Sequence, residues 1–153
     1  MEILLTGHKG FIGGGLYRRL LASGHSVRGI DLAETMLDNL LYCNFPQQEF
    51  DLIIHLAGKS GVRESLTNPS EYWMNNVEAS RRLFERYSNT RIMYASSSSA
   101  YEPDLNPYAA SKYVLEKLAS RYHNTLGMRF HTVYADNCPR ENMFFNKLNN
   151  GTL

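Results

Sequence analysis

The glycine-rich segment Thr6-Gly7-His8-Lys9-Gly10-Phe11-Ile12-Gly13 constrains the fold more than any other part of the sequence. It follows the apolar run Ile3-Leu4-Leu5, which predicts a buried strand, and it leads into apolar residues at helical spacing. Gly7 permits a tight turn, Gly10 lets the backbone approach a pyrophosphate, and Gly13 lets the helix pack closely on the sheet. The order of strand, glycines and helix therefore predicts a dinucleotide-binding loop, with the anion held by N–H groups at the helix start.

Strands and helices alternate along the rest of the chain. We expect strands over residues 3–5, 26–30, 52–57, 91–95 and 127–134, and helices over 11–22, 68–86, 106–123 and 144–149. Residues 34–41 are expected to form a short helix or a passage from helix to strand. This alternation predicts a parallel sheet with crossover helices, which is a doubly wound, Rossmann-type α/β fold.

Length and composition exclude several classes of protein. The 153 residues, 43% hydrophobic and 20% charged, predict one compact globular domain over residues 1–153. A net charge of +1 favours neither nucleic acid nor a membrane surface as a partner. Two cysteines are too few for a disulfide scaffold, and no apolar run suits a signal peptide or a membrane span. These features favour a cytoplasmic protein.

An acidic residue follows the second predicted strand. Asp31 is positioned to accept hydrogen bonds from the adenosine ribose of a dinucleotide, and no arginine follows it directly. The pattern therefore favours NAD over its 2′-phosphorylated form. The alternative is a glycine turn of purely structural use, but strand, loop, helix, strand and acid occur here in the order that dinucleotide binding requires.

Tyr108 and Lys112 lie four residues apart near the start of the helix expected over 106–123, so they share one face. A nearby ammonium group would stabilise the phenolate form of a tyrosine, which makes Tyr108 a candidate general base. The serine cluster Ser96-Ser97-Ser98-Ser99 follows a predicted strand, where open α/β sheets bind their ligands. The alternative interpretation is a surface pair beside a solvated turn, and the upstream dinucleotide loop favours the functional one.

These motifs together resemble the NAD-dependent epimerase/dehydratase family, the extended short-chain dehydrogenases/reductases that act on nucleotide sugars. The matching segments run in order along the chain: residues 6–13, 31, 51–58, 75–77, 96–101, 108–112 and 129–134. Residues 61–69 are similar to a run found in UDP-glucuronate 4-epimerases. The resemblance implies NAD as cofactor and 4-epimerisation of a UDP-sugar, with transient hydride transfer to NAD.

The resemblance also implies roles for individual residues. Ser97, Tyr108 and Lys112 would form the catalytic set, with Tyr108 as the base that takes a proton from a sugar hydroxyl. Ser98 and Thr132 would contact the substrate. The implied NAD-binding residues are Gly7, Gly10, Phe11, Ile12, Gly13, Asp31, Asn44, Leu56, Ala57, Gly58, Asn76, Tyr108 and Lys112.

Departures from the family pattern leave three interpretations open. Family members have a C-terminal substrate-binding region, which we expect to be absent here, and Asn44 stands where the family has an acid that contacts adenine. The first interpretation is a compact epimerase or dehydratase whose substrate site is shared across a homo-oligomer. The second is an oxidoreductase with a smaller or more open site. The third is a non-catalytic NAD-binding module or a truncated product. The Ser-Tyr-Lys set favours the first two, and the missing region favours the third.

The remaining chemistry-bearing residues are expected to be structural. His55 lies within a predicted strand, which indicates a hydrogen-bonded core histidine rather than a ligand. No spacing of His, Cys, Asp or Glu suggests a metal site. Trp73 is interpreted as a packing residue or an oligomer contact.

Overall fold

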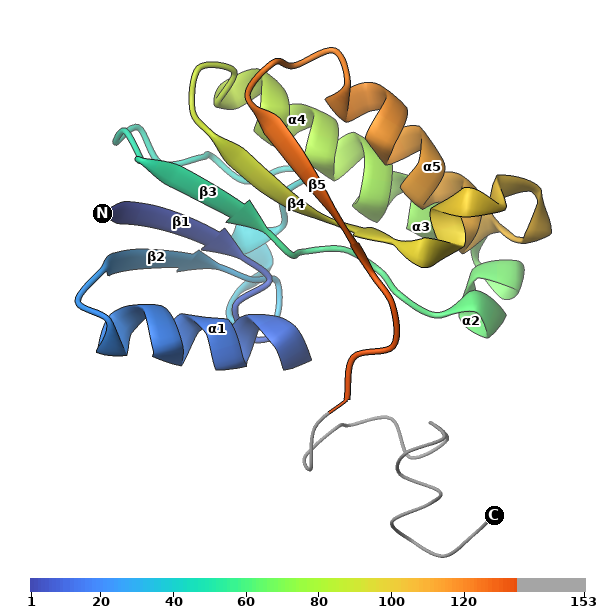
Figure 1. The fold of residues 1–153 in the computed structure, drawn as a ribbon, viewed down its shortest axis with the longest axis horizontal. Helices are drawn as coiled ribbons and strands as arrows, with labels where there is room; N and C mark the ends of the chain where they lie inside the picture. Colours follow the sequence, from blue (N-terminus) through green and yellow to red (C-terminus); the bar gives the residue numbers. More distant parts are fainter. Residues whose placement is uncertain (135–153) are drawn as a thin grey trace, which may run out of the picture.

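The computed structural model describes residues 1–134, which form a five-stranded parallel sheet with helices on both faces (Figure 1). The strands lie in the order β2-β1-β3-β4-β5. Their bounds are β1 Glu2–Thr6, β2 Ser26–Ile30, β3 Leu52–His55, β4 Ile92–Ser97 and β5 Thr125–Phe130. The chain runs outward from β1 to β2 and then returns to the other side of β1. This reversal opens a crevice at the carboxyl ends of β1 and β3, and the predicted doubly wound fold is confirmed.

Helices cover the two faces unequally. Helix α1 lies on one face of the sheet, and α3, α4 and α5 lie on the other (Figure 1). The helices are α1 Phe11–Ala22, α2 Val62–Thr67, α3 Pro69–Trp73, α4 Ala79–Arg86 and α5 Pro107–Ala119. A π-helical turn over Met74–Glu78 joins α3 to α4, so the helix expected over 68–86 is present with one wider turn inside it.

The sheet separates two apolar clusters. On the α1 side, Ile3 and Leu5 of β1 pack with Ile54 against residues that include Leu16 and Leu20 of α1. The larger cluster lies on the α4 and α5 side and includes Leu4 of β1. Its other buried members include Ile53, Leu83, Phe84, Ile92, Tyr94 and Leu115. Successive side chains of a strand point to opposite faces, so a strand that is covered on both faces is apolar throughout. The run Ile3-Leu4-Leu5 of β1 follows this pattern.

Several predicted boundaries differ from the structure. The expected strand over 52–57 ends at His55, and the one over 127–134 occupies Thr125–Phe130. The helix expected to reach residue 123 ends at Ala119. In place of the uncertain element over 34–41 there is a single 3-10 turn, Met36–Asp38. The helix expected over 144–149 falls outside the described residues.

Close backbone contacts set the position of α1. Gly7 has a φ of +76°, and a Cβ there would lie 2.6 Å from the backbone nitrogen of Ala57. A Cβ on Gly13 would lie 2.0 Å from the carbonyl oxygen of Gly7. The turn after β1, the segment after β3 and the start of α1 therefore touch through backbone atoms, which only glycine permits.

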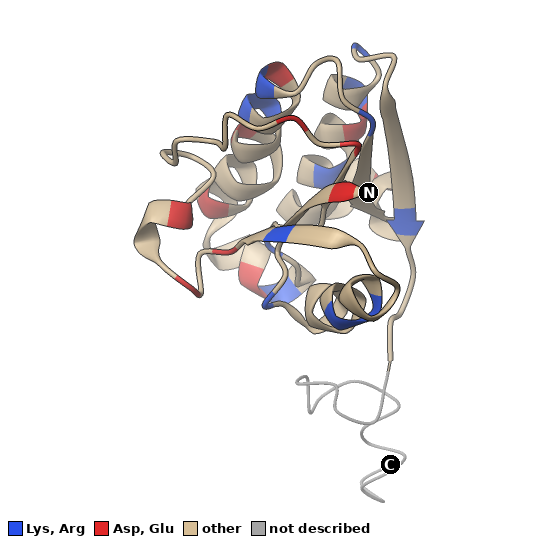
Figure 2. Cartoon of the chain, turned by 90° about the vertical axis from the view of Figure 1, so that its left-hand side faces the viewer, with Lys and Arg blue, Asp and Glu red and all other residues tan. Residues whose placement is uncertain are grey.

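Charged residues of both signs are mixed over the helices and loops seen in Figure 2. In that view no described face is covered by one sign of charge. No helix among the described residues is both long and apolar enough to cross a membrane.

Two alanine substitutions in α1 test the backbone contact. We expect Gly13→Ala to lower the free energy of unfolding by about 1–3 kcal/mol, because the added methyl group overlaps the Gly7 carbonyl. Gly15→Ala is the matched control, since nothing lies within 4 Å of its added Cβ. Gly15→Ala should raise the free energy of unfolding by about 0.5–1 kcal/mol, because alanine has the higher helix propensity. Urea unfolding measures both, and a Gly13→Ala protein as stable as the parent would contradict the packing argument.

Candidate active site

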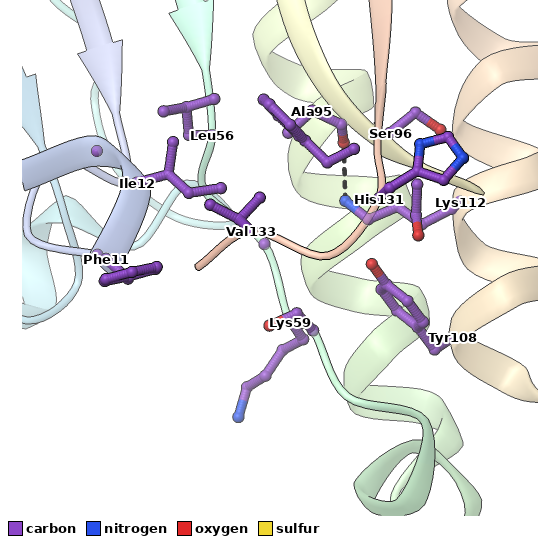
Figure 3. Close-up of a pocket in the computed structure, with 17 residues that line it drawn as sticks. Phe11, Ile12, Leu56, Lys59, Ala95, Ser96, Tyr108, Lys112, His131 and Val133 are labelled. Atoms are coloured by element: carbon purple, nitrogen blue, oxygen red, sulfur yellow. Dashed lines mark hydrogen bonds between the residues drawn. The ribbon is translucent and has the colours of Figure 1, made fainter. Parts of the chain in front are cut away.

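Two adjoining cavities lie at the carboxyl ends of the strands and together form one groove. The first measures about 300 Å³ (Figure 3). It is lined by Gly7, Gly10, Phe11, Ile12, Gly13, Leu56, Gly58, Lys59, Ser60, Ala95, Ser96, Ser97, Tyr108, Lys112, Phe130, His131 and Val133. The second measures about 310 Å³ and extends toward the loop after β2. The cavities share Gly7, Gly10, Leu56, Gly58 and Lys59. The loop predicted from the glycines and the predicted tyrosine–lysine pair therefore line the same groove.

The start of α1 forms one wall of the first cavity. Gly10 caps the helix without a side-chain hydrogen bond, and the first turn contains no acidic residue. The first-turn residues Phe11, Ile12 and Gly13 all line the cavity. The N–H groups of a helix start attract anions, and no local carboxylate competes for them. This wall suits the pyrophosphate of a dinucleotide, as the spacing predicts.

The second cavity is lined by Asp31, the residue predicted to bind the adenosine ribose. The carboxylate of Asp31 accepts hydrogen bonds from the N–H of Lys9 at 2.8 Å and of Ala33 at 2.9 Å. Asn44, predicted to contact adenine, is exposed and is not part of either cavity lining. The lining of this part includes residues that no sequence motif singles out, among them Asp38, Asn39 and Leu40. Asp38 ends the 3-10 turn Met36–Asp38 and the other two residues follow it, and this turn carries no recognisable sequence signal.

Lys112 is a buried cation facing the first cavity. Its side chain is 6% exposed, and its ammonium group donates a hydrogen bond to the carbonyl oxygen of Ala95 at 2.9 Å (Figure 3). Burial lowers the pKa of Lys112 to about 8. Burying a charged group costs free energy, so a buried lysine that lines a cavity is a candidate functional residue.

Tyr108 lines the cavity one helical turn before Lys112. Its ring packs edge-on against Tyr72 at a centroid distance of 6.1 Å. The same four-residue spacing occurs a second time in α5, at Tyr113 and Lys117, where the lysine lies over the tyrosine ring at 5.1 Å and both residues are exposed. Spacing alone therefore does not distinguish the two pairs, whereas burial and the cavity do.

The serine cluster divides into different environments. Ser97 lines the cavity, and its hydroxyl oxygen accepts a hydrogen bond from the N–H of Ser99 at 3.1 Å. Ser96 also lines the cavity and donates to the carboxylate of Glu116 at 2.5 Å. Ser98, one of the two predicted substrate contacts, is not part of the lining. Ser97 is thus the member of the cluster that combines cavity access with the predicted catalytic position.

Asn76 connects three segments of the site. Its amide oxygen accepts from the N–H of Lys59 at 2.7 Å, and its amide nitrogen donates to the Lys59 carbonyl at 3.0 Å. The same nitrogen donates to the hydroxyl of Ser111 in α5 at 2.9 Å. Asn76 lies in the π-helical turn, a feature often found at functional sites. It therefore joins the turn after β3 to the helix that carries Tyr108.

His55 is a hydrogen-bonded core residue, as predicted. Ser80 donates to the carbonyl of Asn76 at 2.9 Å, so its oxygen accepts from Nε2 of His55 at 2.8 Å. Nδ1 of His55 then accepts from the hydroxyl of Thr6 at 2.7 Å. Burial, with a smaller effect of the Lys112 charge, lowers the pKa of His55 to about 3. The imidazole therefore stays neutral and links β1 and β3 to the π-helical turn.

At the end of β5 and in the segment after it, the side chains that line the cavity are not the predicted one. Thr132, the second predicted substrate contact, is exposed and outside the lining. Phe130, His131 and Val133 line the cavity instead, and Figure 3 shows Val133 between the α1 wall and Tyr108. Among residues 1–134, no group of three His, Cys, Asp or Glu side chains is arranged to hold a metal ion.

A family model described as the NAD dependent epimerase/dehydratase family matches residues 3–138. The chain belongs to this family. Protein CapI of Staphylococcus aureus is 31% identical over 182 residues, covering 88% of this chain and 54% of CapI. The structure of MoeE5 in complex with UDP-glucuronic acid and NAD has a TM-score of 0.78 at 31% identity, covering 97% of this chain and 60% of MoeE5.

A second similar structure is UDP-glucuronic acid 4-epimerase from Bacillus cereus in complex with NAD. It has a TM-score of 0.79 at 27% identity, covering 97% of this chain and 61% of the epimerase. The chain therefore spans between 54% and 61% of the length of these three family members.

Replacing the buried cation should stabilise the cofactor-free protein. At pH 7 the native and unfolded states both hold the Lys112 proton, so Lys112→Met removes a buried charge. The substitution should therefore raise the free energy of unfolding by about 2 kcal/mol. Between pH 8 and 10.5 the unfolded state binds more protons than the native state, so wild-type stability rises and the difference should shrink. Urea unfolding from pH 7 to 10.5 measures this.

Lys117→Met is the control, because that lysine is exposed on the same helix. It should change the free energy of unfolding by no more than about 0.5 kcal/mol. A Lys112→Met protein less stable than the parent at pH 7 would show that the ammonium group stabilises the fold.

Proposed function

We propose that this chain is the cofactor-binding and catalytic part of an NAD-dependent nucleotide-sugar epimerase that carries out 4-epimerisation of a UDP-sugar. The observation that carries the proposal is the shared cavity. One wall is the anion-binding start of α1, and the opposite wall bears Ser97, Tyr108 and the buried Lys112. A buried cation one helical turn from a tyrosine suits proton transfer, and the adjoining helix start suits the pyrophosphate of a dinucleotide.

The residues present suit NAD along the whole groove. The N–H groups at the start of α1 would hold the pyrophosphate. A Cβ on any of Gly7, Gly10 and Gly13 would meet backbone atoms, so these glycines let the loop and the helix start pack closely. Asp31 would accept hydrogen bonds from the adenosine ribose. Lys112 would hydrogen-bond the nicotinamide ribose in addition to its present bond to Ala95. Bound NAD supplies a hydride acceptor that later returns the hydride to the substrate.

The protein residues would move and hold the proton. Tyr108 takes a proton from a sugar hydroxyl while the neighbouring Lys112 ammonium stabilises the phenolate. Ser97 would orient that hydroxyl from the end of β4. After the sugar intermediate has turned over, Tyr108 returns the proton to the new hydroxyl. Asn76 keeps the helix of Tyr108 and the turn after β3 at a constant separation through its bonds to Lys59 and Ser111.

The similarity to CapI, MoeE5 and the B. cereus epimerase supports a nucleotide-sugar substrate. Both structures contain NAD, and the MoeE5 complex also holds UDP-glucuronic acid. We take UDP-glucuronate and UDP-glucose as the first substrates to test. The alternative function is NAD binding without turnover.

The second tyrosine–lysine pair of α5 provides a matched test of the base. Tyr108→Phe should lower turnover of UDP-glucuronate or UDP-glucose by about 100-fold or more, as loss of a general base does. Tyr113→Phe removes the same hydroxyl from an exposed position and should leave turnover unchanged. Calorimetry should find that Tyr113→Phe binds NAD as tightly as the parent and that Tyr108→Phe still binds NAD. NAD binding without turnover of any sugar nucleotide by the parent would favour the binding module instead.

We also propose that the protein is a cytoplasmic homo-oligomer whose copies complete the substrate site. Trp73 is 44% exposed and Met74 is 38% exposed at the junction of α3 with the π-helical turn, and these two adjacent apolar side chains are the contact that we propose.

Sedimentation velocity at micromolar concentration tests the assembly. The parent should sediment as a dimer or larger species, and Trp73→Glu should shift it toward the monomer by burying a charge in the contact. Tyr42→Glu changes a residue that is 75% exposed in the loop before β3 and should not alter the mass. A strictly monomeric parent would refute this part of the proposal.

A further inference from the structure

Glu34 joins the loop after β2 to two successive residues of the glycine-rich loop. Its Oε1 atom lies 3.0 Å from Nζ of Lys9, and its Oε2 atom lies 3.2 Å from Nε2 of His8. Both carboxylate oxygens therefore have partners, although the side chain is 46% exposed. No motif in the sequence draws attention to this residue.

His8 provides Glu34 with a fixed contact. The imidazole is 4% exposed because β2 carries a glycine where it packs: a Cβ on Gly29 would lie 2.5 Å from the ring. Tyr17 of α1 packs against the ring at a centroid distance of 5.2 Å. Nδ1 is buried and has no hydrogen-bond partner among the described residues, so the proton belongs on Nε2, which donates to Glu34.

Lys9 is held at both its backbone and its side chain. Its N–H donates to Oδ2 of Asp31 at 2.8 Å, and its ammonium group pairs with Glu34. The hydrogen bond to Glu34 raises the pKa of Lys9, so the lysine stays charged. Lys9 and Asp31 line the same cavity, at the end of the groove proposed to take the adenosine ribose. The ammonium group of Lys9, which lines the cavity together with Asp31, is thus already paired with Glu34.

A 2′-phosphate on that ribose would bring nearly two negative charges toward Asp31 and Glu34. Lys9 contacts Asp31 through its backbone N–H and lines the same cavity, so its ammonium group would be the natural partner of such a phosphate if Glu34 did not hold it. We propose that Glu34 is a specificity-determining residue that excludes NADP, both by neutralising Lys9 and by placing a second carboxylate beside Asp31. This inference rests on the proposed NAD site.

Equilibrium binding of NAD and NADP to four proteins tests the inference. They are the parent, Glu34→Gln, Lys9→Met and the double variant. Glu34→Gln keeps the shape of the side chain, removes its charge and releases Lys9. We expect it to raise NADP affinity by about tenfold or more, as a new charge-assisted hydrogen bond does, while NAD affinity changes less than about threefold. Adding Lys9→Met should remove the gain. NADP binding to Glu34→Gln should also weaken with salt more steeply than NAD binding.

Glu71→Gln is the matched control. Glu71 pairs with Lys59 at 2.7 Å at similar exposure, and Lys59 also lines the groove. Releasing that lysine should change NAD and NADP affinities by the same factor. An unchanged NADP-to-NAD ratio in Glu34→Gln would overturn the inference, as would equal binding of both dinucleotides by the parent. Equal loss of both affinities in Glu34→Gln would show a purely structural role and would also overturn it. If the parent binds neither dinucleotide, the proposed function itself fails.

Discussion

The groove depends on a contact between three backbones. The turn at Gly7 approaches the backbone of Ala57 after β3, and α1 approaches the Gly7 carbonyl at Gly13. Any side chain at either glycine would push these segments apart. Their contact aims the start of α1 across the crevice at the carboxyl ends of β1 and β3. The wall proposed to bind the pyrophosphate therefore exists because three chain segments meet where no Cβ atoms separate them.

A series of hydrogen bonds connects this arrangement across the sheet to the wall that bears Tyr108 and Lys112. Thr6 donates to His55, His55 donates to Ser80, and Ser80 donates to the carbonyl of Asn76. The side chain of Asn76 then connects to the turn after β3 and to α5. Each buried polar group in the series has a partner, which is the condition under which a buried network makes a structure specific. The cofactor wall and the helix of Tyr108 are thereby held as one unit.

The sequence predicts most of the sheet and the cofactor wall, because glycine spacing, apolar runs and an acid after a strand are local signals. Prediction fails where the outcome depends on distant contacts. Tyr108 and Tyr113 have equivalent lysine partners in the sequence, and only packing against the sheet buries Lys112. Likewise, Thr132 matches a family position, yet the chain after β5 turns His131 and Val133 to the cavity.

The adenosine end shows how tertiary contacts replace a missing regular element. The segment between β2 and β3 contains one 3-10 turn and no α-helix. It is held to α4, where Arg82 donates to the carbonyls of Leu40 and Cys43 and Arg86 donates to that of Pro46 at 3.0 Å.

Buried apolar side chains of the same segment complete the larger core: Leu40, Cys43, Phe45 and Phe50. Because this wall is built by a loop, its polar residues come from whichever positions the anchors leave facing the groove. That explains why Asp38 and Asn39 line it and Asn44 does not. A wall of this kind has no sequence period, and only its anchors on α4 and in the core determine which residues reach the cofactor.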